Sequence, residues 1–279
     1  MNKYAVIAVY ALVGLTSFLV FLLLLFPVSF LESRIENWAV SRNIPMQVNN
    51  LEYDFPTGME FSELNLLNIR RTETLATLRP GRVDLQPLSL FSNRLNLSLQ
   101  GATFGGSVQA DLRAPLFTTT AYGVDLIASD LRFVDFPPSS WVRSMVVSGG
   151  ADLQLNRPEA RGTSAPWIGV LQLEDVEALL GNPAVQDIAL DNLNGKIEFL
   201  IQNNVLTIEK SNFKGDALQG TITGRITLGP DQDRTMLALD LTLRVDTAKL
   251  GSPLSALLPK KAWRIRITGP LSTPRFTAT

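Results

Sequence analysis

From residue 44 onward, hydrophobic and polar residues alternate with a period of two along many short stretches of the chain. In the clearest stretch, LALDLTLRV, five apolar side chains share one side of an extended strand. They are Leu237, Leu239, Leu241, Leu243 and Val245. The same alternation recurs at Leu95-Leu97-Leu99, Val108-Ala110-Leu112, Val124-Leu126-Ala128, Ala151-Leu153-Leu155 and Trp263-Ile265-Ile267. Turn signals rich in Gly, Pro and Asn lie between them, at residues 56–58, 105–106, 149–150, 181–183, 229–231 and 269–270. This spacing predicts an antiparallel β domain over residues 44–279.

A sheet with one apolar and one polar face exposes hydrophobic surface unless something covers it. A long sheet of this kind therefore curls, closes on itself or packs against a partner. We predict a mainly β fold with a long, curled antiparallel sheet, either an open trough or barrel-like, and few short helices. In a closed sheet the apolar residues of 237–245 form a core, whereas in an open trough they face lipid acyl chains. Alternation alone leaves both alternatives open.

The N-terminus contains a long uncharged stretch, from Tyr4 through Leu31. About 20 apolar residues in a helix cross a hydrocarbon core of ~30 Å, so we predict a transmembrane helix over residues 4–30. A cleaved secretory signal has a shorter apolar region, of ~7–15 residues, and a small-x-small cleavage site that this stretch lacks. Lys3 and the free amine precede the span, which favours a cytoplasmic N-terminus, residues 1–3. The bulk of the chain is then periplasmic, anchored in a bacterial inner membrane.

The apolar residues of LESRIENWAVSRN, which follows the span, recur at helical spacing with charges on the opposite side. We predict an amphipathic connecting helix over residues 31–43. Two further short helices are expected near residues 174–180 and 253–260. The dipeptide Pro137-Pro138 indicates a rigid connection, and we expect a seam between two halves of the β domain near residues 135–145.

Two residue types are absent, because the 279 residues include no Cys and no His. A disulfide, a thiolate nucleophile, a Ser-His-Asp triad and a His- or Cys-bound metal site are therefore excluded. The chain has 25 Lys and Arg against 26 Asp and Glu, which indicates no basic surface for nucleic acid. We predict no catalytic residues, no cofactor, no metal and no nucleic-acid partner.

One glycine-rich stretch, NFKGDALQGTITGRITLG at residues 212–229, raises the question of a phosphate-binding loop. Such a loop needs G-x-x-x-x-G-K-[ST] at the start of a helix. Here Lys214 precedes Gly215, and the β-branched residues that follow favour a strand. We interpret the stretch as the turn and body of a β-hairpin, with a glycine at a bend within a strand. The S-x-x-K match at residues 211–214 lacks the partner motifs of penicillin-recognising enzymes.

Clusters of acidic residues raise the question of a calcium site. They are Asp231 and Asp233 in one place, and Glu174, Asp175 and Glu177 in another. Calcium binds six to eight oxygens, usually from a Gly-punctuated loop of alternating acids. A hairpin turn and a helix start explain these residues without a metal. Trp141 and Lys260-Lys261 are candidates for partner contacts, with packing and solvation as the simpler interpretations.

Three segments resemble a known group of proteins. Residues 46–66, MQVNNLEYDFPTGMEFSELNL, resemble the opening strand, Pro-x-Gly turn and strand of AsmA-like proteins. Residues 193–228 resemble their repeating unit, and residues 263–278, WRIRITGPLSTPRFTA, resemble their closing G-x-L-x-x-P strand. A short chain with one anchor and about 250 further residues is most similar to the type II secretion system protein N (GspN) family.

The resemblance implies two functions. Type II secretion N proteins are inner-membrane accessory components of the machine that moves folded periplasmic proteins across the outer membrane, and no catalytic residues carry over. AsmA-like proteins form curled β-sheets with an apolar groove, associated with lipid traffic to the outer membrane. We therefore expect a non-catalytic scaffold that contacts other secretion-system proteins. The alternative is a lipid-binding or lipid-transfer module in which Leu237, Leu239, Leu241, Leu243 and Val245 meet acyl chains.

Overall fold

The computed structural model describes most of the β domain and a few residues before it. The described residues are 14, 32–33, 35–37, 40, 45–54, 58–67, 74–115, 121–135, 145–160, 165–182, 185–216, 218–229, 233–245 and 263–278. Apart from Gly14, the predicted span 4–30 lies outside them, so the transmembrane helix stays a prediction. Within these described ranges, no helix combines the length and hydropathy needed to cross a bilayer. The described residues of the stretch 31–43 are helical.

The described chain is mainly β, as predicted, with fifteen strands and, after the helical residues that precede the sheet, two very short helical elements. The strands are β1 (Met46–Asp54), β2 (Gly58–Leu67), β3 (Thr74–Leu78), β4 (Gly81–Leu85), β5 (Arg94–Thr103), β6 (Gly106–Pro115), β7 (Gly123–Arg132), β8 (Met145–Arg157), β9 (Trp167–Asn182), β10 (Val185–Gln202), β11 (Val205–Lys214), β12 (Leu218–Thr227), β13 (Met236–Val245), β14 (Trp263–Pro270) and β15 (Arg275–Ala278). The helical elements are α3 (Pro87–Leu90) and η1 (Phe133–Asp135).

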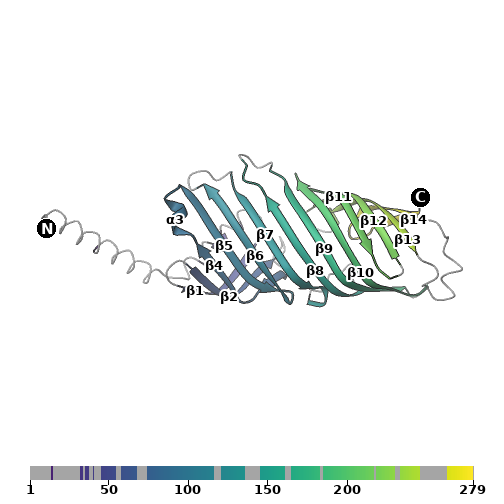
Figure 1. Cartoon of the computed structure of the whole chain (residues 1–279), viewed down its shortest axis with the longest axis horizontal. Coiled ribbons are helices and arrows are strands. Elements are labelled where there is room, and N and C mark those ends of the chain that lie inside the picture. The colour runs from purple at the N-terminus through teal and green to yellow at the C-terminus, as the bar shows by residue number, and fades with distance from the viewer. Residues whose placement is uncertain are drawn as a thin grey trace.

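All fifteen strands form a single antiparallel sheet in which spatial order follows chain order. The path runs from β1 through β2 and β4 to β15, and β3 pairs with β2 beside β4. Figure 1 shows the strands slanting across the long axis of the molecule, with β1 near one end and β14 near the other. The sheet is open, with β1 and β15 as its edge strands. This decides between the open and closed alternatives that the sequence left unresolved.

The strands predicted from alternation are confirmed, and so is the interpretation of residues 212–229 as a hairpin. β11 ends at Lys214, β12 begins at Leu218, and Gly224 lies within β12 at a φ of 131°. The seam expected near residues 135–145 falls mostly on undescribed residues, and sheet pairing continues across it from β7 to β8. The short helix predicted at residues 253–260 also lies outside the described residues.

Two local predictions are wrong for one shared reason, namely bulges within long strands. Residues 149–150 were expected to form a turn but lie inside β8, where Gly149 has a φ of 104°. Residues 174–180 were expected to be helical but lie inside β9, where Asp175 has a φ of 46°. A bulge inserts one extra residue, so apolar residues fall three apart instead of two. Leu173 and Val176 therefore have a spacing that resembles one face of a helix.

These bulges line up across neighbouring strands. Asp130 in β7, Gly149 in β8, Asp175 in β9 and Asn192 in β10 all have positive φ, and the register shifts beside each. Asn, Asp and Gly adopt this left-handed conformation at low cost. The backbone N–H of Asp130 donates to Asp152 Oδ1 at 2.8 Å. Because a bulge bends its strand and increases local twist, a row of them bends the sheet along one line.

The N-terminal end of the sheet, β1–β4, contains a compact hydrophobic cluster. Its buried members are Val48, Leu51, Phe61, Leu64 and Leu78. Ile35, from the helical residues that precede the sheet, packs against them. The same helical residues cover the edge of β1, because Glu36 Oε1 accepts from the N–H of Val48 at 3.1 Å and Glu32 Oε1 from that of Leu51 at 2.9 Å. An edge strand whose N–H groups are occupied in this way is protected from pairing with another chain.

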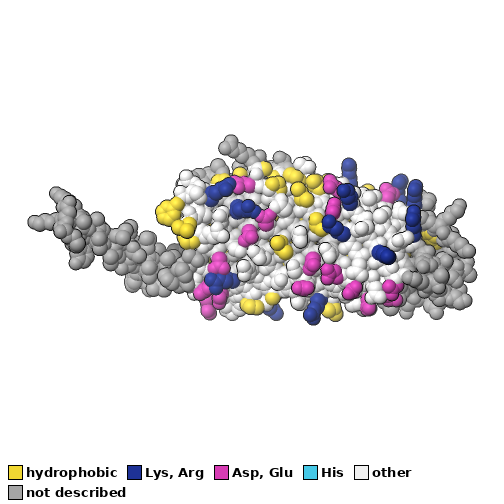
Figure 2. Space-filling view, in the orientation of Figure 1, with side chains coloured by type: hydrophobic (Ala, Val, Ile, Leu, Met, Phe, Trp, Pro, Cys, Tyr) yellow, Lys and Arg dark blue, Asp and Glu magenta, His cyan; other side chains and the backbone are white. Residues whose placement is uncertain are grey.

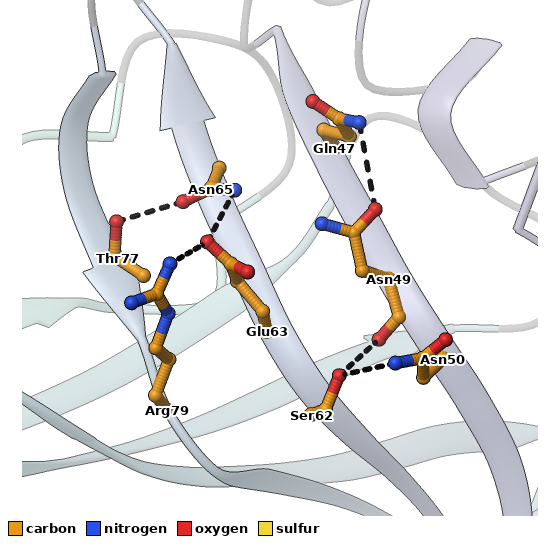
Figure 3. A network of polar contacts seen from close by, with 8 residues as sticks. All are labelled: Gln47, Asn49, Asn50, Ser62, Glu63, Asn65, Thr77 and Arg79. Atoms are coloured by element: carbon orange, nitrogen blue, oxygen red, sulfur yellow. Dashed lines mark hydrogen bonds and ion pairs between the residues drawn. The ribbon is translucent and has the colours of Figure 1, made fainter.

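The opposite face of β1–β3 carries a network of polar side chains (Figure 3). Thr77 Oγ1 donates to Asn65 Oδ1 at 2.7 Å, and Asn65 Nδ2 donates to Glu63 Oε1 at 2.8 Å. The guanidinium of Arg79 also donates to Glu63 Oε1. This bond is the main reason why the pKa of Glu63 lies below its ordinary value. The ion pair between Arg79 and Glu63 is exposed to solvent, so it orients the strands at modest energetic gain.

Candidate functional site: one continuous apolar face

The strand registers bring the apolar residues of every alternating stretch onto the same side of the sheet. Leu241 in β13 lies opposite Ile222 in β12 and Ile265 in β14. At the other end of the path, Leu99 in β5 lies opposite Val83 in β4 and Ala110 in β6. Each bulge adds one residue at the point where the alternation in the sequence also shifts by one, so the apolar side chains stay on the same side of the sheet. We call the resulting surface the apolar face, and the other side of the sheet the polar face.

In the middle of the sheet, β5–β9, the side chains of the apolar face are mostly half-buried. They include Leu97, Leu99, Leu112, Leu126, Leu153, Leu155 and Leu171. Ala128, Leu131, Ala151 and Val176 are the most enclosed, and they flank the row of bulges. Away from the bulges the leucines of this face remain half-exposed, so no second layer among the described residues covers that part of the middle.

Phenylalanine rings lie over glycines of neighbouring strands on this face. A Cβ added to Gly81 would lie 2.0 Å from Cζ of Phe61, one added to Gly169 2.2 Å from Cζ of Phe199, and one added to Gly220 2.5 Å from Cζ of Phe213. Each ring therefore covers backbone that a side chain would otherwise shield, an arrangement that stabilises glycine in a sheet.

The five predicted groove residues on β13 divide into two groups. Leu237 and Leu239 are buried, with 8% and 7% of their surface exposed, in a cluster with Ile208. Leu241 and Leu243 are half-buried on the apolar face. The side chain of Val245 lies outside the described part, although its backbone pairs with Leu218. Leu237 and Leu239 thus serve mainly as packing at the C-terminal end.

One charged side chain interrupts the apolar face. From β4 to β14, Arg157 is the single described residue of that face with an ionisable group, and it is 2% exposed. It ends β8, opposite Val124 of β7, and continues the alternation of Leu153 and Leu155. Its guanidinium carbon stacks 3.7 Å from the ring centroid of Tyr122, and Nη1 donates to the backbone carbonyl of the same residue.

The polar face carries charged groups of both signs, as Figure 2 shows for the side toward the viewer. A hollow of about 870 Å³ on this face crosses β9–β13 and is lined by Lys196, Lys214, Arg244, Glu174 and Asp175 among others. Beside it, a hydrogen bond from Lys196 holds the pKa of the Glu198 carboxyl below its ordinary value. Arg82 acts likewise on Asp84 at the other end of the sheet. These are exposed ion pairs, and they account for the shifts without a catalytic group.

The acidic residues considered for calcium binding are dispersed in the structure. Asp175 Oδ1 accepts from Asn194 Nδ2 at 3.1 Å, and Glu177 Oε2 accepts from Ser148 Oγ at 3.2 Å. Asp233 is exposed in a turn, and Asp231 lies outside the described residues, as do Trp141 and Lys260-Lys261. Where the chain is described, no three potential ligands converge on a point that could hold a metal ion.

Two features of this face were missed from the sequence. Its continuity depends on strand registers and bulge positions, which alternation within one strand does not reveal. Arg157 did leave a signal, because ADLQLNR places it at the next apolar position after Ala151, Leu153 and Leu155.

Comparisons with protein-family models, with curated proteins and with solved structures found no match.

Proposed function

We propose that this protein binds lipid acyl chains along its apolar face, as a membrane-anchored module that carries or shelters lipid. The observation that supports this most directly is an open sheet whose apolar face carries half-exposed leucines on the middle strands, on both sides of the row of bulges. Soluble proteins seldom expose contiguous apolar surface of this extent without using it. The row of bulges supports a curled, trough-like shape, with the apolar residues on its inside.

The dimensions suit an extended lipid chain. The uncovered middle of the apolar face crosses five strands, β5–β9, which at ~4.8 Å between strands gives a length of roughly 20 Å. One leaflet of a bilayer has a hydrocarbon thickness of about 15 Å, half of the ~30 Å core. The uncovered middle is therefore long enough for about one acyl-chain length. Together with the predicted anchor in the inner membrane, this favours lipid handling in the periplasm.

Photo-crosslinking in cells tests this proposal. A photoreactive side chain at Leu153 on the apolar face is compared with one at Gln154, its neighbour on the polar face. We expect lipid adducts at position 153 and few or none at position 154. Equal lipid labelling at both positions, or none at position 153 in a folded protein, would contradict lipid binding on this face.

The second candidate function is a scaffold among type II secretion proteins. The observation that favours it is the C-terminal end of the polar face, where β12–β15 carry five arginines and a single carboxylate, Asp240. These arginines are Arg225, Arg244, Arg264, Arg266 and Arg275. They lie on the last four strands of the path, which ends at the edge strand β15. Thr277 of β15 is exposed and lies opposite Arg266 on this face. Protein adducts from a photoreactive group at position 277, without lipid adducts at position 153, would favour the scaffold over the lipid module.

A further inference from the structure

Arg157 places a positive charge where the rest of the sheet places hydrocarbon. The residue opposite Arg157 in β7 is Val124. In β9 it is Trp167, because Asn156 pairs with Ile168 and the register continues by one residue. Among the described residues, no carboxylate forms an ion pair with Arg157. Its recorded partners are the ring and the backbone carbonyl of Tyr122. These supply a quadrupole and a dipole but no net negative charge.

A buried cation without a counter-charge is costly. The effective penalty for removing a charged group from water is several kcal/mol, and attraction to an anion is the usual compensation. A guanidinium has five N–H donors in a planar fork, and the structure records one of them, on Nη1, with a described acceptor. Such a fork matches the two oxygens of a phosphate or carboxylate.

We propose that Arg157 binds the anionic headgroup of a lipid whose acyl chains lie on the apolar face. This inference rests on the proposed function and adds a ligand class to it, namely acyl lipids that carry a phosphate or a carboxylate. Tyr122 holds the guanidinium in place by stacking, so the charge is oriented before the ligand arrives. Leu155 and Leu126, adjacent on the same face, then contact the beginning of the acyl chain.

The position of Arg157 in the sheet agrees with this role. β8 ends at Arg157, and β5 and β7 begin on the same rim of the sheet. An ion pair between Arg94 and Glu159, at 2.6 Å, joins the start of β5 to the connection between β8 and β9 along this rim. The same rim carries α3, where Leu88 and the adjoining Phe91 are 80% and 88% exposed. Arg157 itself is 2% exposed, and Ala121 and Ala165 beside this rim are buried, so a headgroup reaches the guanidinium by displacing part of what encloses it.

The competing explanation is that Arg157 only braces the ends of β7 and β8. A brace requires only the length and the hydrogen bonds of the side chain. A protein in which Arg157 is only a brace therefore binds lipids without regard to the charge of their headgroups. A headgroup site instead discriminates between lipids that differ in charge alone. Selectivity among bound lipids is therefore the property to measure.

The test uses the full chain purified in detergent and equilibrated with vesicles of equal parts phosphatidylglycerol and phosphatidylcholine of matched acyl chains. Protein-bound lipid is quantified by mass spectrometry. We expect the wild-type protein to enrich the anionic lipid roughly tenfold over the neutral one, which corresponds to about 1.4 kcal/mol. Arg157→Gln should bind both lipids nearly equally, and Arg157→Lys should retain part of the preference. A parallel pair of oleate and oleyl alcohol distinguishes a carboxylate from a phosphate as the favoured anion.

Arg113→Gln is the matched control, because Arg113 lies on the polar face and pairs with Asp125. It should leave the enrichment unchanged. Lipid bound by wild type and Arg157→Gln with the same headgroup ratio would overturn the headgroup site while leaving the apolar face as a lipid site. Absence of bound lipid from the folded wild-type protein would overturn both proposals.

A second measurement uses no substitution of Arg157. A lipid with a photoreactive headgroup is loaded onto the wild-type protein, and the crosslinked peptides are mapped. We expect labelling around Tyr122, Val124 and Trp167, and little around Leu241 or Ile265 at the far end of the face. Labelling spread evenly along the face would contradict a fixed headgroup position, whatever the folding of the Arg157→Gln variant.

Discussion

The N-terminal end of the sheet, β1–β4, and its middle, β5–β9, are built from the same alternating pattern but differ in what covers the apolar residues. At the N-terminal end, Phe61 is 3% exposed, and Ile35 from the preceding helical residues packs against its cluster. In the middle, Leu97 and Leu153 occupy equivalent positions on the same face and remain half-buried. Alternation thus determines which side a residue faces, and a covering element determines whether that side becomes core or surface.

The largest expected effect is loss of a ring from the covered end. Phe61→Ala should lower the free energy of unfolding by about 3–5 kcal/mol, because the ring is almost fully buried. Leu97→Ala in the middle should cost only about 1 kcal/mol, because the side chain is half-exposed already. Urea unfolding followed by circular dichroism measures both. Equal losses would show that the middle is packed as a core.

A smaller effect is expected where a ring lies over a glycine in the middle. Gly169→Ala places a Cβ 2.2 Å from Cζ of Phe199, which has to move, at a cost of about 1–3 kcal/mol. Gly150→Ala is the control, since its nearest neighbour is 3.7 Å away, and it should change stability by less than about 0.5 kcal/mol. Adding Phe199→Leu to Gly169→Ala should recover part of the loss. Indistinguishable thermal unfolding of the two glycine variants would refute this role of Phe199.

Removing the carboxylates that cover the β1 edge should have a moderate effect. Glu32→Ala and Glu36→Ala each leave a partly buried N–H of β1 without its acceptor, at a cost of about 1 kcal/mol. Hydrogen exchange at Leu51 and Val48 should accelerate accordingly. Asn37→Ala, at an exposed position of the same helical stretch, serves as the control. Unchanged exchange at both amides would show that the edge is protected by something else.

The smallest effect concerns pH and the polar network of β1–β3. Arg79 lowers the pKa of Glu63, so the contribution of this pair is present above the ordinary pKa of 4.5 and is lost as pH falls through the lowered value. Glu63→Gln should therefore make Tm less sensitive to acidification, by about 1–2 °C between pH 5 and 3. Arg79→Gln should act in the same way, and the double variant should add nothing further. Steeper pH dependence in either single variant would contradict the assignment.

Much of the fold follows from local pattern. The alternation at residues 95–99, 124–128 and 237–245 is enough to predict the strands, since a period of two over such lengths is typical of a β-strand. The open sheet and the continuous apolar face depend instead on how the strands pair. Those registers are adjusted by bulges at Asp130 and Asp175, which no periodicity reveals in advance.

The failures at residues 149–150 and 174–180 have the same physical origin. A glycine pair ordinarily marks a turn, but Gly149 here supplies the positive φ of a bulge beside Asp175, whose carbonyl oxygen would lie 2.6 Å from an added Cβ. Arg157 illustrates a different difficulty. In the sequence, a charged residue at an apolar position indicates the end of a strand. The strand pairing is needed to show that its neighbours on the face are apolar.

The agreement between spatial order and chain order has a consequence for how such a molecule is made and how it evolves. A chain that emerges N-terminus first finds the pairing partner of each new strand already in place, so assembly can advance strand by strand with short loop closures. Because each strand contacts mainly its two neighbours, a hairpin gained or lost at any connection leaves the rest of the array intact. One such event changes the length of the apolar face by ~10 Å, two strand spacings. The length of the sheet thereby becomes a quantity that duplication and deletion can change.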